Sequence, residues 1–193
     1  MPRPLRGPGG LRMPERSTFP EARLASALLL LYPGDDAAPT IPLTKRHGGL
    51  RAHPGEISLP GGRVDPGDPS REATALREAR EEIGLDESAV RIAGQLDDIW
   101  IPASNHELRP FVATAVQRPL LRAAEVEVED IIELPLSAIL TDEIVSDEEI
   151  EVRGGRVRAA VYRYSAERIW GATARVLSTF VSVVTEAELV PPE

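Results

Sequence analysis

Hydrophobic residues along the chain gather in short runs that are interrupted by glycine, proline and charged residues. The first run covers residues 25–32, is apolar throughout and ends at Pro33-Gly34, so its length favours a buried strand over a helix. Similar runs predict strands over residues 41–46, 90–96, 111–116 and 126–134, with a loop over residues 102–110. The glycine pair Gly154-Gly155 is typical of a hairpin turn and predicts a hairpin arm over residues 153–164.

Two stretches have the spacing of helices. Asp68-Pro69-Ser70 predicts a helix start, with Asp68 as the N-cap and Pro69 at the first helical position. This helix extends to about Ile83, because Gly84 suits a left-handed C-terminal residue. A second helix is predicted over residues 166–184, whose apolar face fits either the core or a homodimer interface. That face consists of Ile169, Trp170, Val176, Leu177, Phe180 and Val184.

The order of these elements (strands, a helix, several strands, a helix) predicts an α+β protein in which helices cover a sheet. Residues 1–20 are dominated by proline and arginine and predict a flexible N-terminal arm, which leaves residues 21–193 as a single domain. Residues 47–70 contain six glycines and four prolines. A compact domain rarely keeps so long an irregular segment unless it binds something, so we expect a binding loop here.

Composition narrows the chemistry. The chain has no cysteine, which excludes disulfides, thiolate metal sites and cysteine nucleophiles, whereas its 31 Asp and Glu residues leave carboxylate chemistry open. The net charge of −9 argues against a nucleic-acid binder. Residues 1–17 contain no apolar run, which argues against a signal peptide, and residues 25–32 fall far below the roughly 20 residues of a membrane span. We therefore expect a cytoplasmic protein without a membrane partner.

Three glutamates share one face of the first predicted helix. With Glu78 at zero and about 100° per residue, Glu82 lies near 40° and Glu81 near 300°. Like charges at these spacings cost about 0.2–0.5 kcal/mol each, so the cluster is either a solvated acidic surface or a cation site. A divalent cation removes the repulsion and prefers oxygen ligands, and Arg77 beside the cluster is a candidate for orienting the carboxylates.

The segment R-E-A-R-E-E-I-G at residues 77–84, preceded by the glycine pair Gly61-Gly62, resembles the signature of the Nudix hydrolase superfamily. The resemblance implies an α/β/α sandwich with a mixed sheet, a Mg²⁺ or Mn²⁺ cofactor and cleavage of a nucleoside diphosphate linkage. It implies Glu78 and Glu82 as metal ligands with Glu81 as a third, and catalytic roles for Arg77, Glu78 and Glu81. Two departures, Asp68 in place of glutamate and eight residues instead of seven before Arg77, leave Asp68 outside the predicted metal site.

The loop upstream of this signature resembles the motif of the coenzyme A (CoA) pyrophosphatase branch of the superfamily, and so does the segment at residues 169–175. The resemblance implies a CoA-like substrate, split to 3′,5′-ADP and 4′-phosphopantetheine. The loop also places cations beside the glycines, and arginine matches phosphate oxygens well, although such cations are also common as solubilising surface residues. The predicted substrate-binding residues are Lys45, Arg46, Arg51, His53, Gly61, Gly62 and Arg63.

Several alternatives stay open at this point. The chain fits a Nudix hydrolase of another substrate, such as NADH or ADP-ribose, or a catalytically silent nucleotide-binding module. The general base is a glutamate of the helix or of a later loop. His53 and His106 are as compatible with ordinary loop hydrogen bonds as with function, and Trp170 fits the core better than an adenine-stacking position.

Overall fold

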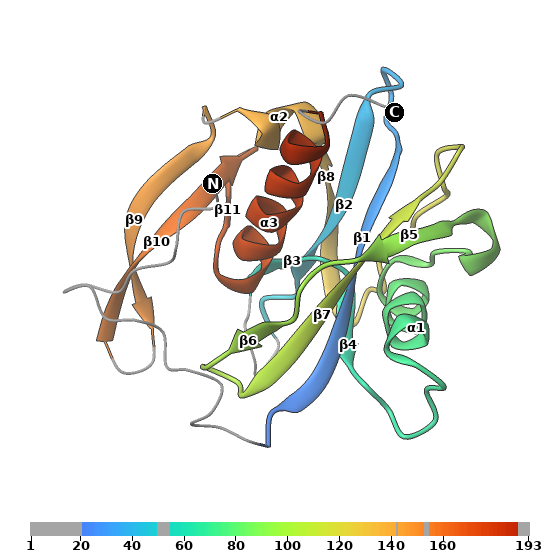
Figure 1. Ribbon diagram of the computed structural model, residues 1–193, viewed down its shortest axis with the longest axis horizontal. Coiled ribbons are helices and arrows are strands. Elements are labelled where there is room, and N and C mark those ends of the chain that lie inside the picture. The colour runs from blue at the N-terminus through green and yellow to red at the C-terminus, as the bar shows by residue number, and fades with distance from the viewer. Residues whose placement is uncertain (1–20, 50–54, 142, 153–154, 189–193) are drawn as a thin grey trace.

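The computed structural model describes residues 21–49, 55–141, 143–152 and 155–188 (Figure 1). Its elements form an eight-stranded mixed sheet with helices on both faces and a separate three-stranded sheet, which confirms the predicted α+β class. In chain order they are β1 (Arg23–Pro33), β2 (Pro39–Arg46), β3 (Ile57–Ser58), β4 (Gly61–Arg63), α1 (Arg71–Ile83), the 3₁₀ turn η2 (Glu87–Ala89), β5 (Arg91–Gln95), β6 (Ile99–Ile101), β7 (His106–Thr114), β8 (Val128–Pro135), α2 (Leu136–Leu140), β9 (Val145–Val152), β10 (Gly155–Tyr164), β11 (Glu167–Ile169) and α3 (Gly171–Glu188).

Strand β1 is the centre of the large sheet. It pairs in parallel with β7 and antiparallel with β2 and β4, while β8 extends the sheet beyond β2. Because side chains alternate between the two faces of a strand, Leu28 and Leu30 pack with α1, whereas Ala27 and Leu29 belong to the core beneath α3. The continuous apolar run of β1 is therefore explained by helices on both faces (Figure 1).

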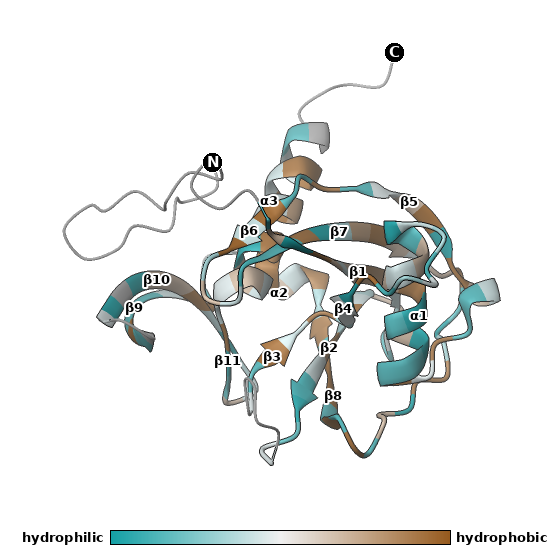
Figure 2. Cartoon of the chain, turned by 90° about the horizontal axis from the view of Figure 1, so that it is seen from below, coloured by the Kyte–Doolittle hydropathy of each residue, from teal (hydrophilic) through white to brown (hydrophobic). Residues whose placement is uncertain are grey.

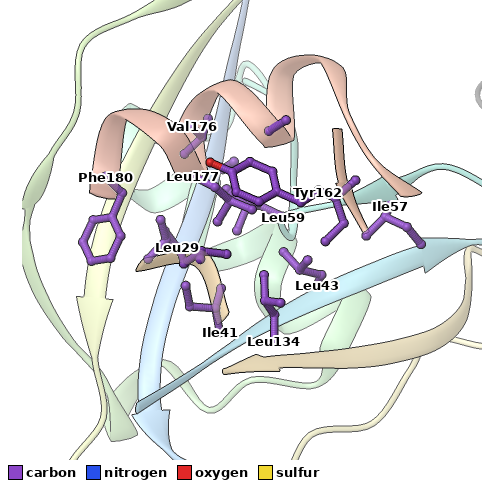
Figure 3. Packing of buried hydrophobic residues seen from close by; sticks show 14 of the residues in the cluster. Leu29, Ile41, Leu43, Ile57, Leu59, Leu134, Tyr162, Val176, Leu177 and Phe180 are labelled. Atoms are coloured by element: carbon purple, nitrogen blue, oxygen red, sulfur yellow. The ribbon is translucent and has the colours of Figure 1, made fainter. Parts of the chain in front are cut away.

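Helix α3 completes the core on one face of the sheet. Val176, Leu177 and Phe180 are buried and point toward Leu29 and Ile41 of the sheet (Figure 3). The sequence left open whether the apolar face of this helix belongs to the core or to a dimer interface. The packing against the sheet places this face in the core. Among the described residues, no helix combines the length and apolar character needed to cross a membrane. The expected cytoplasmic location stays a prediction.

Helix α1 has a defined cap at each end, although the predicted N-cap is wrong. Ser70 is the N-cap, since its Oγ accepts a hydrogen bond from the Ala73 N–H at 3.1 Å. Asp68 lies two residues before the cap, and its carboxylate binds Arg77 instead of capping the helix. Pro69 also precedes the cap, so it does not occupy the first helical position. Gly84 ends the helix with a φ of 65°, as predicted from the steric freedom of glycine.

Other predicted boundaries differ from the structure where elements are very short. Strands β3, β4 and β6 have two or three residues each, too few to show a period, and β7 begins at His106 inside the predicted loop. The last helix begins at Gly171 instead of residue 166. Ser165 and Ala166 have φ values of 48° and 66°, which turn the chain so that β11 pairs with β10.

The three-stranded sheet, in the order β11-β10-β9, lies on the opposite side of the molecule from α1 (Figures 1 and 2). Strand β10 confirms the predicted hairpin arm within its described residues, but β9 was missed because its acidic sequence lacks an apolar run. Residues 153–154 and the predicted N-terminal arm at residues 1–20 lie outside the described residues.

Candidate active site

Glu82 is a buried carboxylate at the junction of α1 and β4. It is 4% exposed, and its Oε2 accepts a hydrogen bond from the Gly61 N–H at 3.1 Å. Burial raises the pKa of Glu82 to about 7, and the charges of Glu78 and Glu127 act in the same direction. Gly61 and Arg46, whose Nη1 lies 3.9 Å from Glu82 Oε1, oppose the shift. Glu82 therefore holds its negative charge at a cost that a bound cation would relieve.

Glu78 lies one turn earlier and touches the second glycine of β4. A Cβ on Gly62 would lie 2.5 Å from the Cδ and Oε1 atoms of Glu78, so this approach requires glycine. Burial raises the pKa of Glu78, while the neighbouring Arg77 lowers it. Each glycine of the pair thus contacts one carboxylate: Gly61 contacts Glu82, and Gly62 contacts Glu78.

Arg77 connects the helix to the loop that precedes it. Its Nε donates to Asp68 Oδ1 at 2.9 Å, and its Nη2 donates to the Arg63 carbonyl at 3.0 Å. Its Nη1 lies 2.9 Å from Glu78 and 3.1 Å from Glu81. The Arg77 guanidinium holds the pKa of Asp68 well below its usual range. This geometry suits the predicted orienting role of Arg77. It also shows that the Asp68 carboxylate binds a side chain of the helix, that of Arg77.

The three glutamates differ in exposure more than their helical angles predicted. Glu82 is buried with Ala75, Ala79 and Ile83, whereas the side chain of Glu81 is 53% exposed. The buried face of α1 therefore includes Glu82 at its edge. This is possible because Gly61 and Gly62 of β4, which have no side chains, approach that edge. Glu81 stays at the surface, where Arg77 binds it.

Glu127 is a site residue that the sequence did not reveal. It lies in the loop between β7 and β8, and its negative charge contributes to the raised pKa values of both Glu78 and Glu82. The Ala124 N–H donates to the Glu82 carbonyl at 2.9 Å, and the Glu127 carbonyl accepts from the His47 N–H at 2.9 Å. The loop is thus fastened to the end of α1 and to the end of β2. No local pattern distinguishes Glu127 from the other acidic residues around it, so only tertiary structure could find it.

The predicted cations are spread over different environments. Arg46 is the described one that approaches the glutamate pair, and its Nε is buried without a hydrogen-bond partner among the described residues. Lys45 pairs with Glu167 at 2.9 Å and Glu129 at 3.3 Å, and Arg63 donates to His106 Nε2 at 3.0 Å. Arg51 and His53 lie outside the described residues.

Gly61 and Trp170 have contacts that bear on their predicted roles. The Gly61 N–H is directed at Glu82, so its predicted contact with a diphosphate stays a prediction. Trp170 packs against Ile150, Ala159 and Val161 of the small sheet, which agrees with its expected place in a core.

The donor set fits a hard divalent cation in its chemistry. Glu78, which is partly buried, and Glu82, which is buried, offer oxygen ligands with raised pKa values, which is the environment that a cation stabilises. In the part of the chain that the structure describes, no three carboxylate or imidazole groups form a ready-made metal cage. Mg²⁺ commonly takes one or two protein carboxylates and completes its shell with water and phosphate, so these two glutamates are sufficient protein ligands. Arg77 binds the Oε2 atom of Glu81, which leaves the Oε1 atom of this carboxylate for a third ligand.

Comparison with known proteins identifies the family. Residues 22–153 match the family model described as NUDIX domain. The chain belongs to the NUDIX domain family. It is 37% identical over 168 residues to "Nudix hydrolase 22, chloroplastic" of Arabidopsis thaliana, covering 83% of this chain and 55% of that protein. It is 36% identical over 139 residues to "Uncharacterized Nudix hydrolase NudL" of Photorhabdus laumondii, covering 72% and 74%.

A solved structure confirms the Nudix fold. The Nudix hydrolase RenU of M. smegmatis superposes with a TM-score of 0.59 at 16% identity, covering 97% of this chain and 98% of that one. This likeness concerns the fold alone. The chain spans only about half the length of the plant relative, so the match describes the shared NUDIX domain.

The two glycines of β4 should respond differently to alanine. A Cβ on Gly61 would lie 2.5 Å from the Ser26 carbonyl oxygen and 2.7 Å from the Ala27 Cα, both of which are backbone atoms. We expect Gly61→Ala to lose about 1–3 kcal/mol in the free energy of unfolding, measured with urea. Gly62→Ala should lose less, because the Glu78 side chain can move, but should weaken Mn²⁺ binding. Gly67→Ala, whose Cβ meets open space, is the matched control, and equal stability of all three variants would contradict the proposed contacts.

The raised pKa of Glu82 predicts a pH-dependent stability in the absence of metal. Between the ordinary pKa of 4.5 and about 7, the folded protein binds more protons at this group than the unfolded chain does. The free energy of unfolding should therefore fall as the pH rises through this window, by about 3 kcal/mol in total from this group. Urea titrations with chelator at pH 5 and pH 8 measure the change. Glu82→Gln should remove most of it, and an unchanged slope in this variant would show that Glu82 is not the group responsible.

Proposed function

We propose that this NUDIX-domain protein is a Mg²⁺- or Mn²⁺-dependent pyrophosphohydrolase of nucleoside diphosphate derivatives, with coenzyme A as its substrate. The observation that carries the proposal is the pair of carboxylates held against the glycines of β4, the buried Glu82 and the partly buried Glu78. A protein that only binds a nucleotide has no need to hold two like charges close together at a partly desolvated site, because each such charge destabilises the other. The relatives in the family that bear the name Nudix hydrolase support an enzyme.

The metal site is proposed from Glu78 and Glu82, with Glu81 as a third ligand. A divalent cation bound there would neutralise charge on the diphosphate and acidify an attacking water. The chain supplies the arrangement around it: Gly61 fixes one carboxylate, and Arg77 orients Glu78 and Glu81. Arg46, beside Glu82, is placed to neutralise a phosphate oxygen as well.

A carboxylate must also accept the proton of the attacking water. We propose Glu127 for this role, since its charge acts on both Glu78 and Glu82 and its side chain is exposed to solvent, where it can release the proton again. The water oxygen would bond to one phosphorus while the bridging P–O bond breaks. Glu81, also exposed, is the alternative proton acceptor on the helix.

The choice of CoA rests on the cations at the end of β2 and in β4, which are Lys45, Arg46 and Arg63. CoA carries a 3′-phosphate in addition to its diphosphate and therefore needs more than one cationic contact. Arg46 and Arg63 flank the glycine pair, and Lys45 would have to exchange Glu167 and Glu129 for a phosphate. NADH and ADP-ribose lack the 3′-phosphate, so they are the natural competitors in a test.

Incubation with CoA and Mg²⁺ should yield 3′,5′-ADP and 4′-phosphopantetheine, separated and identified by mass. Glu82→Gln removes a charged ligand while keeping a side-chain oxygen, and we expect its rate to fall by about 100-fold or more. Glu72→Gln changes an exposed glutamate of the same helix and should keep the wild-type rate.

Absence of 3′,5′-ADP from the wild-type reaction, or full activity of Glu82→Gln, would contradict the proposal. Dephospho-CoA should be the poorer substrate if the loop reads the 3′-phosphate. Faster turnover of NADH or ADP-ribose would assign the protein to another substrate of the same reaction. Tight nucleotide binding that is insensitive to chelator and gives no products would favour a binding module.

A further inference from the structure

A second ionic cluster lies beneath the first turn of α1, away from the glutamate pair. Arg71 Nη1 donates to Glu107 at 3.1 Å and to Asp98 at 3.5 Å, and Arg109 binds Asp98 through two hydrogen bonds of 2.8 Å. Glu107 is 5% exposed and the side chain of Arg71 is 13% exposed. We refer to these four residues as the Arg71 cluster. Nothing in the proposed reaction uses it directly.

Arg71 also binds the backbone of two neighbouring strands. Its Nη2 donates to the Ala25 carbonyl of β1 and to the Glu107 carbonyl of β7, both at 2.8 Å. One guanidinium at the first residue of α1 therefore fixes the helix to β1 and β7 together. A lysine could not reproduce this, because its single ammonium lacks the planar fork of donors.

The register of β1 brings the cluster close to the glycine pair. Ser26 of β1 pairs with Gly62 of β4 on one side and with Arg109 of β7 on the other. Neighbouring strands lie about 4.8 Å apart, so the positions of Gly62 and Arg109 are separated by about 10 Å. The cluster and the glutamate site are thus attached to the same short stretch of sheet.

Arg71 shares its helical face with Glu78 and Glu82. At about 100° per residue, Arg71 lies near 20° when Glu78 is at zero and Glu82 is near 40°. Fixing Arg71 therefore fixes the rotation of α1 about its axis for both glutamates. At the radius of the side chains, a rotation of about 20° would move a carboxylate by about 2 Å, enough to separate Glu82 from Gly61.

We propose that Arg71 is a positioning residue of the active site, which holds α1 at the rotation where Glu78 meets Gly62 and Glu82 meets Gly61. The inference rests on the proposed metal-dependent function of these glutamates. Stability alone does not explain the Arg71 cluster, because apolar residues of similar volume commonly replace a buried ionic network without loss. What the network supplies is one defined geometry, because both Nη groups of Arg71 reach their acceptors at a single placement of the helix. The Nε of Arg71 is buried without a hydrogen-bond partner among the described residues.

The test compares Arg71→Met and Arg71→Lys with the wild-type full chain. Mn²⁺ affinity is followed by electron paramagnetic resonance, turnover by CoA hydrolysis, and folding by urea unfolding under the same conditions. We expect Arg71→Met to bind Mn²⁺ about tenfold more weakly and to lose about 100-fold in kcat, with KM for CoA nearly unchanged. Arg71→Lys should lie between this variant and the wild type. Arg163→Met, which breaks the salt bridge between Arg163 and Glu148 in the small sheet, should match the wild type in Mn²⁺ affinity and in kcat.

The outcomes separate this inference from the proposed function. Wild-type Mn²⁺ affinity and kcat in both Arg71 variants would overturn the positioning role. If Arg71→Met does not fold, Arg71→Lys decides, because it keeps the charge while losing the double contact with the strands. Weakened Mn²⁺ binding in a protein that does not cleave CoA would support the role of Arg71 while overturning the choice of substrate. A wild-type protein that binds no Mn²⁺ would overturn both.

Discussion

The close approach of helix α1 to β4 is the constraint on which the site depends. Two glycines remove every side-chain atom between the helix and the strand, so Glu78 and Glu82 can lie directly against the backbone. The same approach removes Glu82 from water and partly desolvates Glu78, and the pKa values of both rise as a result. The contact that positions the carboxylates therefore also makes their negative charge costly, and a bound cation would lower that cost.

Charge around this contact is arranged in layers. Arg77 binds Asp68, Glu78 and the exposed Glu81, while Arg46 approaches Glu82 from β2. The net charge of −9 is thus compatible with anionic substrates, because cations are placed locally where the glutamates and the glycine pair meet. Glu127 adds a further negative charge from a loop that is bonded to the end of α1.

Sequence patterns predicted the elements with a long or strongly periodic signal. The apolar run of β1, the glutamate spacing of α1 and its glycine end all follow from local rules, and the structure has each of them. Strands β4 and β6 were not predicted because three residues show no period, and β9 was not predicted because its acidic sequence lacks an apolar run. Glu127 and Arg71 could not be assigned from sequence at all, since their contacts join distant segments and leave no spacing to read.

The hydrogen bonds between the end of α1 and the loop that follows β7 have a consequence for how the protein folds. The Ile83 and Glu82 carbonyls at the end of the helix are satisfied by N–H groups of Arg122 and Ala124, which follow β5, β6 and β7 in the chain. A nascent chain that stops before this loop holds the glutamates but lacks the partners of the helix end. The site has no local precursor, so it forms only when contacts of high sequence separation close together, which places its assembly late and makes it cooperative with the whole sheet.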